Sequence, residues 1–289
     1  MKFSVTHSTT YRYASAVRDS FNDARLCPVS DDFQQCHSFG LEIQPSSTSV
    51  LRRLDFYTNQ VYHFELIEPH DSLQVVAHSK VETFADVRDF SVPSPSSLLM
   101  DLPRDERYYD FLVASPRVAL GPMIEHEAKE IVNPSDDVQA QVEAIMNFIF
   151  EGFTYAPGST HVESTVMQVF VQKSGVCQDF AHVMIALCRA SGIPARYVSG
   201  YFYVDSPVSD SADDNSESHA WLECFIPSIG WVGYDPTHNR RSDDTYIKVA
   251  VGRDYADVRP LAGTFRGEAS VAMDVAVTVA LSDFAFSPG

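Results

Sequence analysis

The hydrophobic pattern of this chain changes period near its middle, which limits the folds open to it. Up to about residue 85, apolar and polar residues alternate in short runs separated by turn residues, as in an antiparallel sheet. From Met123 the spacing becomes helical. The 289 residues suffice for two domains. In the N-terminal part we predict strands over residues 2–13, 36–44, 49–57, 60–67 and 73–84.

The C-terminal part is predicted to mix helices with strands. Ser135-Asp136-Asp137 precedes an apolar stripe at helical spacing, which predicts a helix from about 136 to 151. A second helix is predicted from about 177 to 190, because Gly192 and Pro194 would end it. Further strands are predicted over residues 195–203, 219–225 and 231–235, and at the tail, where Val271, Met273, Val275, Val277 and Val279 alternate with other residues.

A stretch rich in proline and serine separates the two patterns. Few backbone hydrogen bonds can form regularly there, which is typical of a connector. We therefore predict an N-terminal β-rich domain over 1–87, a connector over 88–122 and a catalytic core over 123–289 that includes the C-terminal strand. The expected fold class is α+β, with an antiparallel β-sandwich as the N-terminal domain.

The charge balance excludes one class of partner. The chain has 21 Lys and Arg against 39 Asp and Glu, a net charge of −18, and such a field repels phosphate backbones and anionic lipid surfaces. We expect neither nucleic acid nor a membrane as a partner. The N-terminus lacks the apolar stretch of a secretory signal, and no run is long enough to span a bilayer. The sequence therefore predicts a cytoplasmic protein.

The cysteines direct the search for chemistry. There are five, with no CxxC pair, which is typical of a reducing compartment and leaves at least one thiol free. Cys177 stands where a loop enters the second predicted helix, and the positive end of a helix dipole favours a thiolate there. The alternative is that Cys177 is a small core residue, as we expect of Cys188 and Cys224.

His219 and Asp235 are the candidate partners of this thiol. A thiolate nucleophile needs a base, and the base needs an acceptor that orients its ring. If the hairpin turns near residues 225–229, His219 and Asp235 fall nearly opposite each other on one face. The alternatives are a surface histidine on a strand and a turn-forming aspartate before a proline.

Four sequence blocks carry a family resemblance. They are GVCQDFAH (175–182), GIPARYVSGY (192–201), SHAWLE (218–223) and GWVGYDPT (230–237). Their order and spacing resemble those of the bacterial transglutaminase-like superfamily. Weaker similarity extends to FTY (153–155), to GRDYADV (252–258) and to the β-rich N-terminal region, so the resemblance covers most of the chain.

The resemblance implies both a fold and a chemistry. It implies a papain-like core with Cys177 as nucleophile, His219 as general base and acid, and Asp235 as the residue that orients His219. The family chemistry is acyl transfer from an amide through a thioester. We favour water over an amine as acceptor, hence a protease or amidase acting on a protein, a peptide or another amide. The alternatives are a cross-linking transglutaminase and a non-catalytic binding module.

Other residues near these blocks have two interpretations each. The Cys177 N–H is the obvious oxyanion donor, and Tyr155 and Gln178 are candidates for a second one. Trp221 and Trp231 are candidates for walls of the acyl pocket. For all four residues, a packing or surface role is the alternative.

Two acidic features are also ambiguous. Asp179 is expected either to accept hydrogen bonds in the first helical turn or to pair with Arg196. The loop before His219 would be a lid, a determinant for basic substrates, or simply a solvated loop, and its calcium-ligand character is weak. Its acidic residues are Asp205, Asp210, Asp213, Asp214 and Glu217.

A zinc-binding protein is the competing hypothesis from another class. Its ligands would come from Cys177, His182, His219 or Asp235. Closely spaced ligand pairs would mark such a site, and only Cys177 with His182 comes near, on different faces of a helix. We therefore predict no metal site and no cofactor.

Overall fold

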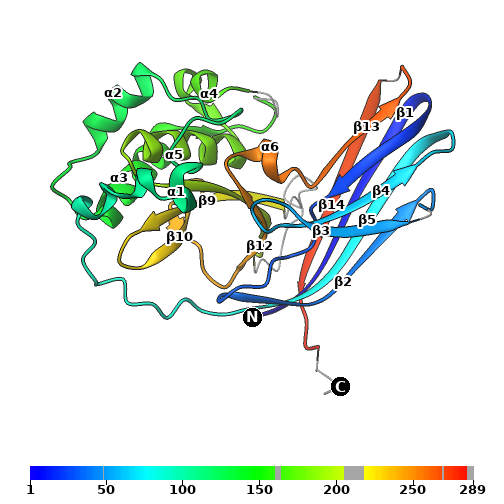
Figure 1. Ribbon diagram of the computed structural model, residues 1–289, viewed down its shortest axis with the longest axis horizontal. Coiled ribbons are helices and arrows are strands. Elements are labelled where there is room, and N and C mark those ends of the chain that lie inside the picture. The colour runs from blue at the N-terminus through cyan, green and yellow to red at the C-terminus, as the bar shows by residue number, and fades with distance from the viewer. Residues whose placement is uncertain (48, 160–163, 205–217, 269, 285–289) are drawn as a thin grey trace.

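The computed structural model describes residues 1–47, 49–159, 164–204, 218–268 and 270–284. These residues form two parts, a curled β domain and a core of helices and a sheet (Figure 1). The predicted α+β class with an N-terminal antiparallel β domain is confirmed. The predicted acidic loop over 205–217 lies outside the described residues.

The N-terminal domain has a strand at each place where the alternating pattern predicts one. These strands are β1 (Lys2–Ala24), β2 (Gln34–Gln44), β3 (Val50–Leu54), β4 (Gln60–Leu66) and β5 (His70–Thr83). With β13 (Leu261–Arg266) and β14 (Val271–Leu281) they form a 7-stranded sheet. Its order is β2-β5-β1-β4-β3, and β13 and β14 also pair with β1.

Strand β1 curls this sheet. Its first half pairs with β5 and β14, whereas its last residues pair with β4 and β13. The register with β5 shifts between Arg12 and Val17, near the point where β1 changes neighbours. A local shift of this kind increases strand twist. The two halves of the sheet pack around a shared apolar core that includes Phe64, Leu73 and Val75.

The C-terminal strand joins the N-terminal domain. Its alternating pattern forms a strand as predicted, and β14 pairs with β1 from Tyr13↔Val271 to Phe3↔Leu281. The predicted core segment 123–289 includes this strand. An alternating pattern identifies a strand and its buried face but does not name the neighbouring strand. The β domain therefore contains residues from both ends of the chain.

The core combines a 5-stranded sheet with several helices. The sheet has the order β11-β10-β9-β8-β12. Its strands are β8 (Ala195–Phe202), β9 (Ser218–Ile226), β10 (Gly230–Asp235), β11 (Arg240–Arg241) and β12 (Tyr246–Gly252). The helices are α2 (Pro122–Ile131), α3 (Val138–Gly152), α4 (Val166–Gln172), α5 (Cys177–Ala190) and α6 (Tyr255–Val258). None of the helices in the described residues is both long and apolar enough to cross a membrane.

Short elements complete the core. The connector contains two 3₁₀ helices and one helical turn, η1 (Ser96–Leu99), η2 (Leu102–Arg104) and α1 (Glu106–Tyr109). Two short strands, β6 (Thr154–Tyr155) and β7 (Ser174–Gly175), pair in parallel just before α5 begins.

Helix α5 is the centre of this core. It has the predicted bounds, and it packs between β8 and β9 on one side and α2, α3 and α4 on the other. Its residues from Asp179 to Arg189 are all buried. Gly192 ends the helix with a φ of +76°, a conformation that costs glycine little, and Pro194 cannot continue it. A helix buried on all sides holds its N-terminus in a fixed position.

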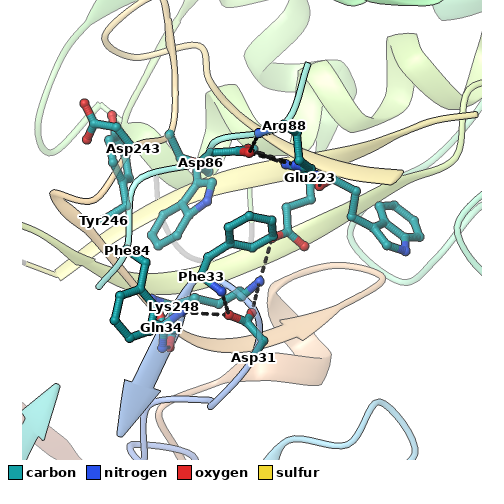
Figure 2. Close-up of a pocket in the computed structure, with 14 residues that line it drawn as sticks. Asp31, Phe33, Gln34, Phe84, Asp86, Arg88, Glu223, Asp243, Tyr246 and Lys248 are labelled. Carbon is teal, nitrogen blue, oxygen red and sulfur yellow. Dashed lines mark hydrogen bonds and ion pairs between the residues drawn. The ribbon is translucent and has the colours of Figure 1, made fainter. Parts of the chain in front are cut away.

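A chain of ion pairs joins the two parts of the molecule, and Figure 2 shows its Asp31, Lys248 and Glu223 members. Lys248 on β12 lies 2.7 Å from Asp31 of the N-terminal domain and 2.8 Å from Glu223 on β9. Glu223 lies 2.6 Å from Arg196 on β8. Burial raises the pKa of Glu223, but the two cations outweigh burial and lower that pKa to about 2. Loss of one member would leave a buried charge unpaired, so the network fixes the N-terminal domain against the core sheet.

Candidate active site

Cys177 occupies the first position of α5, as predicted. Val176 before it is extended, with φ −117° and ψ 179°, so the chain turns into the helix at the cysteine. The Asp179 carboxylate accepts a hydrogen bond from the Val176 N–H at 2.9 Å, which closes this turn. Cys177 is partly exposed, whereas Cys188 and Cys224 are buried in the core as expected. The Cys177 thiol thus lies at the helix end where unpaired N–H groups gather.

Gly175 permits the turn that presents Cys177. A Cβ atom on Gly175 would lie 2.8 Å from both the Cβ and the Oδ2 of Asp179. We expect Gly175→Ala to displace Asp179 and lower the free energy of unfolding by about 1–3 kcal/mol, as measured by urea unfolding. Gly152→Ala is the matched control, because nothing lies within 4 Å of a Cβ there. Equal stability of the two variants would contradict this account of the turn.

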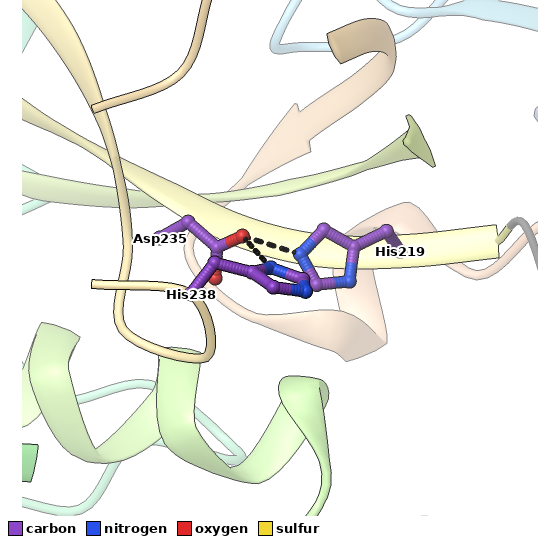
Figure 3. Close-up of side chains that lie close together, drawn as sticks. All are labelled: His219, Asp235 and His238. Carbon is purple, nitrogen blue, oxygen red and sulfur yellow. Dashed lines mark hydrogen bonds and ion pairs between the residues drawn. The ribbon is translucent and has the colours of Figure 1, made fainter. Parts of the chain in front are cut away.

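His219 and Asp235 meet as the hairpin predicts (Figure 3). The strands pair through Trp231↔Phe225 and Tyr234↔Leu222, and β9 begins at Ser218. The Nε2 of His219 lies 2.8 Å from the Oδ2 of Asp235. Because a carboxylate only accepts hydrogen bonds, Nε2 carries the proton. The other ring nitrogen, Nδ1, is the one left for Cys177, whose proximity raises the pKa of His219.

The surroundings of His219 favour its cationic form. Burial lowers the pKa of His219, but the hydrogen bonds to Asp235 and to Cys177, with the charges of these groups, outweigh burial and raise the pKa to about 10. The side chain of Asp235 has no exposed surface, and that of His219 is 8% exposed. Asp235 and Cys177 thus favour the protonated form of His219 over the neutral form.

Two residues that the sequence analysis did not single out also hold Asp235. The Nδ1 of His238 lies 2.7 Å from Oδ2 of Asp235, and the Tyr246 hydroxyl donates to the same oxygen at 2.8 Å. The Thr237 N–H donates to Oδ1 at 2.8 Å. Hydrogen bonds from the two histidines, and their charges, lower the pKa of Asp235 despite its burial. His238 directly follows the Asp-Pro-Thr block, and this position is the sequence signal that could have identified it.

The structure brings Tyr155 close to the candidate nucleophile. Tyr155 on β6 pairs with Gly175 on β7, two residues before Cys177. Its side chain is half exposed, and its ring lies edge-on to Phe180 at 6.2 Å between ring centroids. Burial and then the charge of Cys177 raise the pKa of Tyr155. Gln178 follows Cys177 in α5 and is partly exposed. Both stay candidates for the second oxyanion donor.

The two tryptophans lie at different depths. Trp221 is buried and stacks against His219, with ring centroids 6.1 Å apart. Trp231 is the second residue of β10, four residues before Asp235, and four strand residues span about 13 Å. The Arg196 guanidinium lies over the Trp231 ring, 4.2 Å from its centroid. Trp221 thus backs the His219 ring, whereas Trp231 packs along the sheet away from Asp235.

The alternatives for Asp179 and His182 now have definite answers. Arg196 pairs with Glu223, so the Asp179 carboxylate serves the helix turn through Val176. His182 is buried, and its Nε2 accepts a hydrogen bond from the Tyr255 N–H at 3.1 Å.

One group of potential metal-binding side chains coincides with the candidate triad. In the described part of the chain, the only set of three or more His, Cys, Asp or Glu side chains spaced to hold a metal is His219, Asp235 and His238. Neither Cys177 nor His182, the pair considered for zinc, belongs to it. Hydrogen bonds to Asp235 already engage both histidines, which favours the triad interpretation of this group.

Comparison with known proteins identifies the family. Residues 125–236 match the transglutaminase-like superfamily model, and residues 3–82 match the bacterial transglutaminase-like N-terminal region. An uncharacterized protein of Mycobacterium leprae is 34% identical over 279 residues, which cover 95% of this chain and 97% of that protein. The chain belongs to the transglutaminase-like superfamily. The four sequence blocks of this superfamily fall on α5, β8, β9 and β10, the elements that build the site.

Two further similarities extend over different lengths. The protein-glutamine gamma-glutamyltransferase of Pseudomonas aeruginosa is 34% identical over 116 residues, which are 38% of this chain and 17% of that protein. A solved structure from Cytophaga hutchinsonii, described as a candidate cysteine protease, superposes with a TM-score of 0.79. It is 24% identical, over 99% of this chain and 92% of that one. This likeness shows that the whole chain shares that fold.

Proposed function

We propose that this protein is a cysteine-dependent acyl-transfer enzyme that cleaves amide bonds with Cys177, His219 and Asp235. One observation carries the proposal. Asp235 holds His219 through Nε2, and Cys177, at the first position of α5, is close enough to His219 to raise its pKa. A nucleophile, a base and an orienting group in this order are the parts that nucleophilic catalysis requires.

The first half of the reaction forms a thioester. The Cys177 thiolate attacks the amide carbonyl carbon, and the resulting oxyanion lies near the backbone N–H groups that begin α5. The His219 imidazolium gives its Nδ1 proton to the leaving nitrogen as the carbon–nitrogen bond breaks. An amine leaves, the acyl group stays on sulfur, and His219 is neutral.

The second half releases the acyl group to water. Neutral His219 takes a proton from water, the hydroxide adds to the thioester carbon, and the carbon–sulfur bond breaks. The products are a carboxylic acid and the Cys177 thiolate beside protonated His219. Cys177 is partly exposed, which lets water reach the thioester without a dedicated site.

An amine acceptor is the second candidate function. The observation in its favour is the 34% identity over 116 residues to a protein-glutamine gamma-glutamyltransferase. Incubation with glutamine-containing peptides, with and without a primary amine, separates the two by product mass. A hydrolase converts the glutamine amide to an acid whether or not the amine is present. A transglutaminase joins the amine to the peptide.

Selective alkylation tests the proposed triad without a known substrate. We expect iodoacetamide to label Cys177 at pH 6 at least about tenfold faster than any other thiol, because the imidazolium of His219 stabilises a thiolate. The label is located by mass spectrometry in the wild type and in His219→Ala.

The wild type and the variant must differ for the proposal to hold. We expect His219→Ala to lose the labelling at pH 6 and to regain it only at alkaline pH. If Cys177 labels no faster than the partly exposed Cys36, or if His219→Ala labels like the wild type, the proposed function is wrong.

A further inference from the structure

Asp235 is held by more donors than a histidine-orienting carboxylate needs. Its Oδ2 accepts from three side chains on three segments: His219 on β9, His238 after β10 and Tyr246 on β12. A carboxylate oxygen offers about two lone-pair directions. The orientation of Oδ2 toward His219 therefore depends on all three donors.

His238 is the exposed member of this set. Its side chain is 40% exposed, against 8% for His219 and none for Asp235. The two imidazole rings lie 5.2 Å apart between centroids, and the Phe202 ring lies 4.8 Å from His238 and 5.6 Å from His219. His238 thus lies between solvent and the buried pair of His219 and Asp235.

The charges around His238 come from few groups. Asp235 and His219 face it directly. Arg240 lies 5.9 Å from the centre of the Phe202 ring and pairs with Asp243. The hydrogen bond to Asp235 is therefore the contact that connects His238 to the candidate triad.

We propose that His238 is a positioning residue of the triad: its Nδ1–H aims the Asp235 carboxylate at His219 and keeps water from their hydrogen bond. The inference rests on the proposed roles of Cys177 and His219. A hydrogen bond shielded from water is stronger than an exposed one. His238 therefore supports the imidazolium of His219, and through it the reactivity of Cys177, without touching the substrate.

Two substitutions with side chains of similar size separate the effect of the hydrogen bond from the effect of packing. In His238→Asn the amide nitrogen stands where Nδ1 stood, whereas His238→Leu fills the same space without a donor. We expect His238→Leu to slow iodoacetamide labelling of Cys177 at pH 6 about tenfold and to move its pH midpoint upward. His238→Asn should keep most of the wild-type rate. Once an amide substrate is found, kcat should follow the same order with KM unchanged.

His63→Leu is the matched control. His63 forms a similar pair in the N-terminal domain, where its Nδ1 lies 2.9 Å from Asp23, and its loss should leave labelling unchanged. Thermal unfolding of each variant checks that it folds, and His238→Ala replaces His238→Leu if the latter does not.

The outcomes separate this inference from the proposed function. Slow labelling in His238→Leu with rescue in His238→Asn supports the positioning role. Wild-type labelling in His238→Leu, or equal loss in both variants, overturns it while the triad stands. If labelling of the wild type does not depend on His219, the proposed function fails first.

Discussion

Cys177→Ala is expected to lower amide-cleaving activity by at least about 10⁴-fold, and His219→Ala to lower it about as much. The two side chains act as one unit. The Cys177 thiolate forms when His219 takes the thiol proton, and Asp235 holds the His219 ring in place. Loss of either member removes the thioester route. The double variant should therefore be no slower than the single variants, which is the non-additivity expected of a catalytic unit.

The measurement is kcat/KM on one amide substrate for the wild type, both single variants and the double variant. Cys36→Ala is the matched control, since this thiol is also partly exposed but belongs to β2 of the N-terminal domain. Retention of more than about 1% of the activity in Cys177→Ala, or additive losses in the double variant, would show that the chemistry proceeds without this pair.

Acidification from pH 7 to pH 4 is expected to destabilise the fold by about 3 kcal/mol for each of two buried histidines. Burial lowers the pKa of His7 from 6.5 to about 4, and it lowers that of His182 to about 4 against the opposing charge of Asp254. Both folded pKa values lie below the unfolded value. The unfolded chain therefore binds more protons, and stability is lost as the pH falls from about 6.5 to 4.

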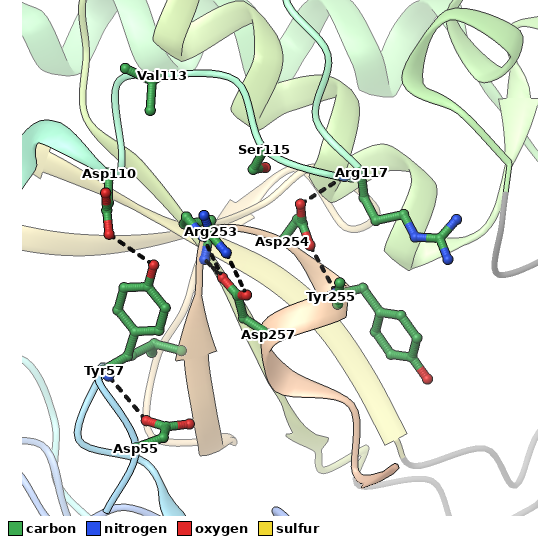
Figure 4. A network of polar contacts seen from close by, with 12 residues as sticks. Asp55, Tyr57, Asp110, Val113, Ser115, Arg117, Arg253, Asp254, Tyr255 and Asp257 are labelled. Atoms are coloured by element: carbon green, nitrogen blue, oxygen red, sulfur yellow. Dashed lines mark hydrogen bonds and ion pairs between the residues drawn. The ribbon is translucent and has the colours of Figure 1, made fainter. Parts of the chain in front are cut away.

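Burial keeps His182 neutral, and its hydrogen bond also requires the neutral ring. Its Nε2 accepts from the Tyr255 N–H at the start of α6, whose cap residue Asp254 also accepts from the Arg117 N–H. Figure 4 shows these contacts of Asp254 beside the Arg253–Asp257 ion pair. A protonated ring nitrogen cannot accept a hydrogen bond, so protonation of His182 would break the contact that holds α6.

Urea unfolding followed by tryptophan fluorescence at pH 7, 5.5 and 4 measures this dependence. His182→Gln keeps an acceptor but cannot be charged, so it should reduce the loss of stability by about half, and addition of His7→Gln should remove most of the rest. The raised pKa of His219 acts only above pH 6.5, where its contribution is lost as the pH rises. A wild-type pH dependence in the double variant would rule out these histidines as the cause.

The sequence predicted those parts of the site that depend on local pattern. The start of α5 at Cys177 follows from the loop before it and from Gly192 and Pro194 after it, and the structure has the helix with those bounds. The hairpin of β9 and β10 brings Asp235 to His219 because both strands and their short turn are visible in the sequence. The blocks of the superfamily identified the same residues independently.

The remaining features depend on contacts between distant segments. The partner of Arg196 is Glu223 rather than Asp179, because adjacent strands bring Arg196 and Glu223 together. His238 and Tyr246 converge on Asp235 from the turn after β10 and from β12. Single-sequence periodicity does not reveal such convergence, and it gave no signal that β14 would leave the core for β1.

The placement of β13 and β14 on β1 bears on how the chain folds during synthesis. Strand β1 leaves the ribosome well before two of its neighbours, which lie more than two hundred residues later in the sequence. The β domain must wait until β13 and β14 have been made, and such long-range closure is intrinsically slow. A fragment ending at residue 87 would expose an unpaired edge of β1 and should aggregate. The helices and the sheet of the core are thus made before the β domain can be completed.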